Sequence, residues 1–240
     1  MSRIYQNLGD QELSDTNKLQ WEFANEAYEP ELERKNIEKY VYDQEMSDAE
    51  TAVWHNHTDK RTHVASRGST TAYDWGVSDL QIGLGIEGMG SRFKKAERQT
   101  KSAHDKYGYT TDVSGHSLGG NVSSHLTQRL GNNSWFGEAT TFNSGVSTLG
   151  KGRSGSRARR ACQKPDPPAY CDKITHLKEK GDLVSNRNIV CDGLTLGLAP
   201  EHCTKTDPFG ATIYYDHTQH KKPGWGLMRR VRPHSLTNFA

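Results

Sequence analysis

One short stretch of the chain combines the residue types that nucleophilic ester chemistry requires. Residues Gly115–Gly120 read Gly-His-Ser-Leu-Gly-Gly and fit the pattern G-x-S-x-G. In this pattern the serine sits on a tight strand-to-helix turn, and the glycines let the strand and the helix come close enough for its hydroxyl to project above a sheet. A β-prone run precedes the motif at Thr110–Val113, and apolar residues recur at helical spacing in Asn121–Leu130. This context favours Ser117 as a nucleophile over an incidental serine in a glycine-rich loop.

A serine hydroxyl needs a base to accept its proton and an acid to orient that base. With a G-x-S-x-G serine, these partners follow in the chain order serine, acid, histidine. Asp182 follows an apolar strand candidate at Lys173–Lys178, and catalytic side chains of α/β sheets sit at such strand ends. His234 lies in the last stretch of the sequence, and spacing alone favours it as the base. The alternatives are the acids Asp166, Asp172, Asp192 and Asp207 and the bases His202, His217 and His220.

Short strand candidates alternate with helical stretches along the chain. The expected strands are His63–Ser66, Thr110–Val113, Ala139–Phe142, Lys173–Lys178 and Ala211–Tyr215. The expected helices are two short ones within Leu19–Tyr42, divided at Pro30, followed by Ser91–Tyr107 and Asn121–Leu130. This alternation predicts an α/β fold with a mainly parallel central sheet flanked by helices. We expect residues 1–20 to form a flexible lead-in and residues 21–240 to form a single domain.

Composition and charge narrow the class of protein. A chain of 240 residues is long enough for one domain with a substantial core. The net charge of +2 provides no global attraction to nucleic acid or to an anionic membrane. No apolar run is long enough to span a bilayer, and no apolar segment of a secretory signal follows Met1. We therefore expect a cytoplasmic protein, and a viral or secreted setting stays open.

Four cysteines fall within one short part of the sequence. They are Cys162, Cys171, Cys191 and Cys203. Disulfides, free thiols and a zinc site with nearby histidines are all compatible with this grouping, and sequence does not choose a pairing. The absence of any CxxC pair weighs against a structural zinc site. Disulfides would be unusual in a reducing cytosol.

Taken together, the motifs resemble those of the class 3 lipases, the fungal triacylglycerol lipase-like branch of the α/β hydrolases. The likeness rests on four stretches in the family's order. They are Ser66–Thr70 continuing into Asp74-Trp75 and Ser78–Leu80, then Gly115–Gly120, Gly181–Val184 and His234–Phe239. Two stretches depart from the family's pattern. Ser66 stands where the family has Phe or Tyr before Arg-Gly, and Asn143–Val146 stand where it commonly reads Gly-x-Pro-Arg.

Carried over position by position, the resemblance implies a complete hydrolytic site. It implies Ser117 as nucleophile, Asp182 as orienting acid and His234 as general base. It also implies an oxyanion hole formed by the backbone N–H groups of Leu118 and Ser69. Such a site requires neither a metal nor an organic cofactor.

An apolar, glycine-rich segment, which begins near Trp75, precedes the G-x-S-x-G motif. Within it, Gly83–Gly88 matches G-x-G-x-x-G, but no strand and no βαβ unit frame it, so a dinucleotide site is not expected. We expect a lid or acyl-site lining instead, and an ordinary buried strand and turn is the alternative. The residues expected to line it are Trp75, Leu80, Ile82, Leu84 and Ile86.

Two basic clusters, in residues 151–160 and 221–232, bear on the substrate. If they lay together at the mouth of the site, they would favour an anionic phospholipid surface, whereas apart they are ordinary solvated loops. We expect a serine carboxylic-ester hydrolase acting on acylglycerols or phospholipids at a lipid–water interface, with peripheral membrane contact and no nucleic-acid partner. The alternatives are a small-ester or feruloyl-type esterase, a serine peptidase, and a non-catalytic lipid- or nucleic-acid-binding protein on the same scaffold.

Overall fold

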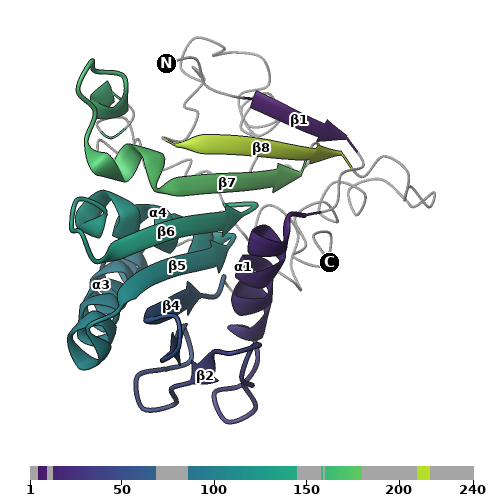
Figure 1. Cartoon of the computed structure of the whole chain (residues 1–240), viewed down its shortest axis with the longest axis vertical. Coiled ribbons are helices and arrows are strands. Elements are labelled where there is room, and N and C mark those ends of the chain that lie inside the picture. The colour runs from purple at the N-terminus through teal and green to yellow at the C-terminus, as the bar shows by residue number, and fades with distance from the viewer. Residues whose placement is uncertain are drawn as a thin grey trace.

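The computed structural model describes residues 5–9, 13–68, 86–144, 158, 160–179 and 210–216. These residues form one α/β arrangement of strands and helices (Figure 1). The elements in chain order are β1 (Tyr5–Gly9), α1 (Asp15–Glu26), β2 (Val41–Tyr42), β3 (Thr51–Asn56), β4 (Arg61–Ser66), α3 (Ile86–Tyr107), β5 (Thr110–His116), α4 (Leu118–Leu130), β6 (Phe136–Phe142), the 3-10 helix η1 (Ala169–Asp172), β7 (Ile174–Glu179) and β8 (Ala211–Asp216).

All eight of these strands join one sheet in the order β1-β8-β7-β6-β5-β4-β3-β2. The run from β4 to β1 is parallel, and β2, β3 and β4 pair antiparallel at one edge. Helix α1 covers one face of the sheet, and α3 and α4 cover the other (Figure 1). The predicted α/β class with a mainly parallel sheet is confirmed. Because these strands are parallel, the carboxyl ends of β4 to β8 all lie at the same end of the sheet, where the sites of α/β proteins form.

The expected strands and the helices at Ser91–Tyr107 and Asn121–Leu130 are all present. Each lies within a slightly longer element, except that the strand expected at Lys173–Lys178 is β7, one residue further along at Ile174–Glu179. The start of the chain differs from the irregular lead-in expected for residues 1–20. There Tyr5–Gly9 form β1 beside β8, and α1 already begins at Asp15. The helix begins at this point because the Ser14 hydroxyl accepts a hydrogen bond from the Asn17 N–H, 3.3 Å away.

The prediction of a second helix after Pro30 is wrong. The segment that follows Pro30 forms turns and a short bridge between Ile37 and Tyr40. The buried side chain of Arg34 organises this segment by donating to the carbonyl oxygens of Ala27 and Asp48, at 3.1 and 2.8 Å. These tertiary bonds to backbone carbonyls outweigh the helical spacing of the apolar residues.

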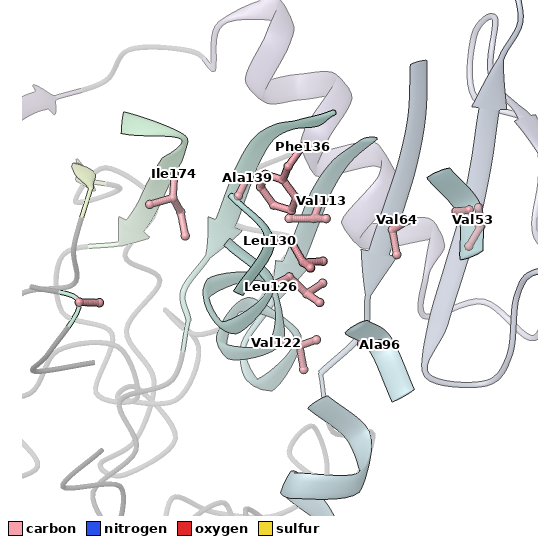
Figure 2. Close-up of a cluster of buried hydrophobic side chains, with 12 residues drawn as sticks. Val53, Val64, Ala96, Val113, Val122, Leu126, Leu130, Phe136, Ala139 and Ile174 are labelled. Carbon is pink, nitrogen blue, oxygen red and sulfur yellow. The ribbon is translucent and has the colours of Figure 1, made fainter. Parts of the chain in front are cut away.

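The larger core lies between the sheet and α4 (Figure 2). Val122, Leu126 and Leu130 follow one side of α4 and are buried against the strands, where they meet Val113 of β5 and Ala139 of β6. Full burial of each aliphatic side chain stabilises the fold by roughly 1.5–3 kcal/mol. This packing fixes the direction in which α4 leaves the sheet, and so fixes the turn that joins β5 to α4.

The face under α1 contains polar groups as well as apolar ones. Phe23 of α1 stacks on His63 of β4 with ring centroids 3.8 Å apart, and His63 Nε2 lies 2.8 Å from Ser114 Oγ of β5. Burial lowers the pKa of His63 well below its usual range, so the ring is neutral near neutral pH. These contacts hold α1 against β4 and β5.

Within the described residues, no helix is long and apolar enough to cross a bilayer.

Candidate active site

Ser117 occupies a strained turn between β5 and α4. Its backbone angles are φ 55° and ψ −119°, a region that non-glycine residues rarely adopt. The Ser117 N–H donates to the carbonyl oxygen of Phe142 at the end of β6, 3.0 Å away. The predicted strand, sharp turn and helix around Ser117 are therefore all present. Strain of this kind is typical of a serine nucleophile presented at the top of a sheet.

The glycines of the motif allow three segments to converge on this turn. A Cβ on Gly115 would lie 2.9 Å from the Gly120 nitrogen. A Cβ on Gly119 would overlap the carbonyl oxygen of Ser66 and lie 2.8 Å from that of Arg67. The end of β4, the end of β5 and the first turn of α4 are thus in direct backbone contact, which larger residues at these glycines would prevent.

Leu118 is the first residue of α4 and is buried. The first N–H groups of a helix have no partner within the helix, and its N-terminus carries a partial positive charge. The Ser117 side chain makes no capping hydrogen bond to this end. The Leu118 N–H therefore has the place on the fold that stabilisation of a developing oxyanion requires.

The segment after β4 lies against the serine. A Cβ on Gly68 would lie 3.1 Å from the Ser117 Cβ and would overlap the phenol oxygen of Tyr28. That phenol oxygen accepts a hydrogen bond from the Gly68 N–H at 2.9 Å and lies 2.7 Å from His116 Nδ1. The backbone that leads into Ser69 is therefore held next to the candidate nucleophile.

A family model described as "Phospholipase-like: Tle-like phospholipase domain" matches residues 10–171, which include β4, the Ser117 turn and α4. The chain belongs to this phospholipase-like family. The resemblance to lipases that the four motifs indicate is confirmed at this level. No curated protein matches the chain significantly.

Two solved structures are similar to this phospholipase-like domain. One is the Lip2 lipase from Yarrowia lipolytica, with 14% identity and a TM-score of 0.46 over 73% of this chain and 75% of that chain. The other is a triacylglycerol lipase from Penicillium expansum, with 15% identity and a TM-score of 0.44 over 84% of this chain and 78% of that chain.

Several predicted site residues of the phospholipase-like domain lie outside the described residues. They are Ser69, Trp75, Leu80, Ile82, Leu84, Asp182 and His234. Ile86, the last of the expected lid residues, is the first residue of α3. The structure does show that β7 ends at Glu179, shortly before Asp182, and that β7 neighbours β6, which neighbours β5. The roles of Asp182 and His234 stay predictions.

Sequence reasoning missed three residues that lie close to the turn. In the sequence, Tyr28 falls within the stretch Leu19–Tyr42 that is expected to be helical, and His116 occupies a variable position of the G-x-S-x-G motif. Asn143, at the end of β6, is fully buried with a positive φ of 42°, and its N–H donates to the Leu177 carbonyl oxygen at 2.9 Å. The sequence signal for Asn143 was its departure from the Gly-x-Pro-Arg pattern of the class 3 lipases. No comparable signal marked Tyr28.

The cysteine alternatives are resolved for one pair. Cys162 and Cys171 form a disulfide with Cα atoms 5.6 Å apart, so these two thiols are not zinc ligands. Cys191 and Cys203 lie outside the described residues. Across the part of the chain that the structure describes, no group of three His, Cys, Asp or Glu side chains could hold a metal ion.

Proposed function

We propose that this phospholipase-like domain is a serine hydrolase that cleaves carboxylic esters of phospholipids, with Ser117 as the nucleophile. The observation that carries the proposal is the strained backbone of Ser117 at the junction of β5 and α4. A fold that only bound lipid would have no use for this strain, because its effect is to present a side chain for attack. Membership of a phospholipase-like family supports the phospholipid class of substrate.

The proposed reaction proceeds through an acyl-enzyme. Ser117 Oγ attacks the acyl carbon while His234 accepts its proton, and Asp182 orients His234 and stabilises its cation. His234 then gives that proton to the alcohol oxygen as the ester C–O bond breaks. The alcohol departs, and the acyl group stays on Ser117. Water then attacks the acyl carbon, again with His234 as base, and the fatty acid is released with Ser117 restored.

The negative charge of both tetrahedral intermediates falls on the former carbonyl oxygen. We assign its stabilisation to the N–H groups of Leu118 and Ser69. The place of Leu118 at the N-terminus of α4 and the contact of Gly68 with Ser117 support this assignment. One such donor lowers the barrier by roughly 3–4 kcal/mol.

The lipid would be met at a membrane surface. We propose peripheral contact, in which the basic residues of 151–160 and 221–232 attract anionic head groups. This element of the proposal predicts faster turnover on vesicles that contain anionic phospholipid than on vesicles of zwitterionic phospholipid alone. Added salt should reduce that difference, since it screens surface charge.

The test is fatty-acid release from phospholipid vesicles by the wild type, Ser117→Ala and Ser124→Ala. Ser124 is a matched control, because it lies in α4, which begins directly after Ser117, and its hydroxyl donates within that helix to the Gly120 carbonyl, 2.9 Å away. We expect turnover by the wild type and Ser124→Ala and background rates for Ser117→Ala. A fluorophosphonate probe should label Ser117, as judged by mass spectrometry of the modified peptide.

The outcomes separate the alternatives. Turnover of acylglycerols or p-nitrophenyl acetate without turnover of phospholipids would keep the serine mechanism and change the substrate. Cleavage of amide substrates would indicate a peptidase. Absence of ester turnover and of fluorophosphonate labelling in the wild type would overturn the proposal.

A further inference from the structure

We propose that Tyr28 is a positioning residue for the oxyanion hole. Its phenol fixes the backbone of Gly68 against Ser117 and so aligns the N–H group of the next residue, Ser69. The inference rests on the proposed function, because it assigns a task within the same ester hydrolysis. Tyr28 itself is not assigned any contact with the substrate.

The phenol joins two segments that meet at the nucleophile. It accepts a hydrogen bond from the Gly68 N–H at 2.9 Å and forms a second hydrogen bond, 2.7 Å long, with Nδ1 of His116. A phenol can donate one hydrogen bond while accepting another. In the arrangement where the phenol donates to Nδ1, the neutral His116 ring carries its proton on Nε2. One side chain thus connects the residue before Ser117 with the residue before Ser69.

The space around Gly68 leaves little freedom for this backbone. A Cβ on Gly68 would lie 3.1 Å from the carbonyl oxygen of His116 and 3.1 Å from the Ser117 Cβ. A shift of Gly68 therefore changes its distance from Ser117 and, under the proposed function, the alignment of the donor that follows it. Oxyanion donors act at about 2.7–3.1 Å, and a misplacement of about 1 Å can cost on the order of 100-fold in rate.

A different set of contacts holds the preceding residue. The Arg67 N–H donates to the carbonyl oxygen of Glu50 at 3.1 Å, and Arg92 of α3 donates from Nη2 to the carbonyl oxygen of Arg67. Burial lowers the pKa of Arg92, and Glu50 opposes that effect. Arg67 is therefore anchored from the turn just before β3 and from α3, whereas Tyr28 anchors Gly68, the residue next to Ser69. Loss of the phenol hydroxyl should loosen the Gly68 end while the Arg67 end stays in place.

The test replaces only the hydroxyl, in Tyr28→Phe. The soluble ester p-nitrophenyl butyrate removes any effect of binding to a lipid surface. Rates are expressed per active site after titration to completion with a fluorophosphonate. We expect kcat to fall about 10- to 100-fold with KM within about threefold of the wild type. The inhibition constant of a trifluoromethyl ketone, which mimics the tetrahedral adduct, should rise by the same factor as kcat/KM falls.

The control is Tyr42→Phe. Tyr42 lies in β2, away from the Ser117 turn, where its hydroxyl accepts a hydrogen bond from Arg34 at 3.4 Å. We expect this variant to keep wild-type kcat, KM and inhibition constant. A purely structural role for Tyr28 would lower the melting temperature or the number of titrated sites, but it would leave kcat per site and inhibitor affinity unchanged. That result would overturn the inference while the wild type and Ser117→Ala still established the hydrolase. If the wild type itself showed no ester turnover and no labelling, both proposals would fall.

Discussion

Gly119 of α4 packs against Ser66 of β4 so closely that a methyl group on its α-carbon would overlap the Ser66 carbonyl oxygen. The same methyl group would stand 2.6 Å from the Ser66 carbonyl carbon, which is backbone and has no room to move aside. The second glycine of the G-x-S-x-G pattern thus serves the packing of α4 on the sheet. The first, Gly115, has its own steric reason, because its α-carbon faces the backbone of Gly119 and Gly120.

Gly119→Ala should destabilise the fold and abolish activity together. Overpacking in a filled site costs about 1–3 kcal/mol or more, and relief would require α4 to move away from Ser66. Gly90→Ala is the matched control, since a Cβ at Gly90 in α3 meets nothing within 4 Å. It should leave activity unchanged and stabilise the helix by about 0.5–1 kcal/mol. Urea denaturation measures the stability of the two variants, and an ester hydrolysis assay measures their activity. Equal stabilities for Gly119→Ala and Gly90→Ala would contradict this steric account.

Gly68→Ala should affect activity more than stability. The new methyl group would overlap the Tyr28 phenol oxygen, which is the far end of a side chain and can be displaced more readily than backbone. We expect at least a 10-fold loss of kcat/KM. In the Tyr28→Phe background no phenol oxygen is present, so the two substitutions should be non-additive. A double-mutant cycle on p-nitrophenyl butyrate hydrolysis measures the coupling, and strictly additive effects would argue against the contact.

Asp43→Asn should destabilise the domain at neutral pH and have little effect in acid. Burial alone would raise the pKa of Asp43, but hydrogen bonds from Lys106 and Tyr107, at 2.7 and 2.5 Å, outweigh it and lower that pKa below its usual range. Burial and the bond to Asp43 also raise the pKa of Tyr107 to about 12. A lowered carboxyl pKa stabilises the folded state above the unfolded pKa, and this contribution is lost as pH falls through the folded pKa.

The expected cost of Asp43→Asn is therefore about 1–3 kcal/mol at pH 7. The gap from the wild type should begin to narrow below about pH 4 and should close as the pH falls through the lowered pKa of the folded state. Urea denaturation at pH 7 and at acidic pH below about 4 measures this difference in stability between the wild type and Asp43→Asn. The exposed Asp105 of α3 supplies the control, and Asp105→Asn should change stability little at either pH. A gap of constant size across the range would contradict the assignment.

Removal of the Cys162–Cys171 disulfide should lower stability without changing the rate at 25 °C. The bridge closes a loop with a sequence separation of 9 residues, for which the loop-entropy estimate is about 2–3 kcal/mol. For a chain of this size that corresponds to a fall in melting temperature of roughly 4–10 °C. The bridged segment contacts Gly131 through Tyr170 at the opposite end of α4 from Ser117. The double variant Cys162→Ser, Cys171→Ser tests this, and a loss of kcat at 25 °C would contradict it.

The redox state of Cys162 and Cys171 also indicates the cellular compartment in which the protein resides. The expected cytoplasmic location stays a prediction, and structural disulfides persist mainly in oxidising compartments. Trapping of thiols in intact cells, followed by mass spectrometry of the Cys162 and Cys171 peptides, would show which form exists there. An oxidised pair would argue against a cytosolic location.

The parts of the fold that sequence predicts well are those specified by local patterns. The Ser117 turn was predictable because its glycines, preceding strand and following helix are consecutive in sequence. Parallel strands such as β6 and β7 were predictable because short stretches with β-branched or aromatic residues, bounded by polar turns, mark them. Local patterns also account for the α/β class and for the family resemblance, since both depend on the order of such segments.

The parts that sequence missed depend on partners far away along the chain. The contacts of Tyr28 with Gly68 and His116 span 40 and 88 residues, so no local pattern reveals them. The irregular segment after Pro30 exists because Arg34 finds backbone carbonyls, and helical spacing does not report such bonds. Strand β3 lacks a clear alternation because its two faces are both largely buried.

The parallel pairing of β1 with β8 joins the two extremes of the described chain, with Tyr5 beside Thr212. On the ribosome, the segment that becomes β1 is made about 200 residues before its partner, the segment that becomes β8. Closing so long a loop costs entropy that no nearby contact repays at that stage. The growing chain must therefore carry the β1 segment unpaired until β8 has been made. Completion of the sheet at this edge is consequently a late event of biogenesis, and until then the segment is exposed to proteases and to association with other chains.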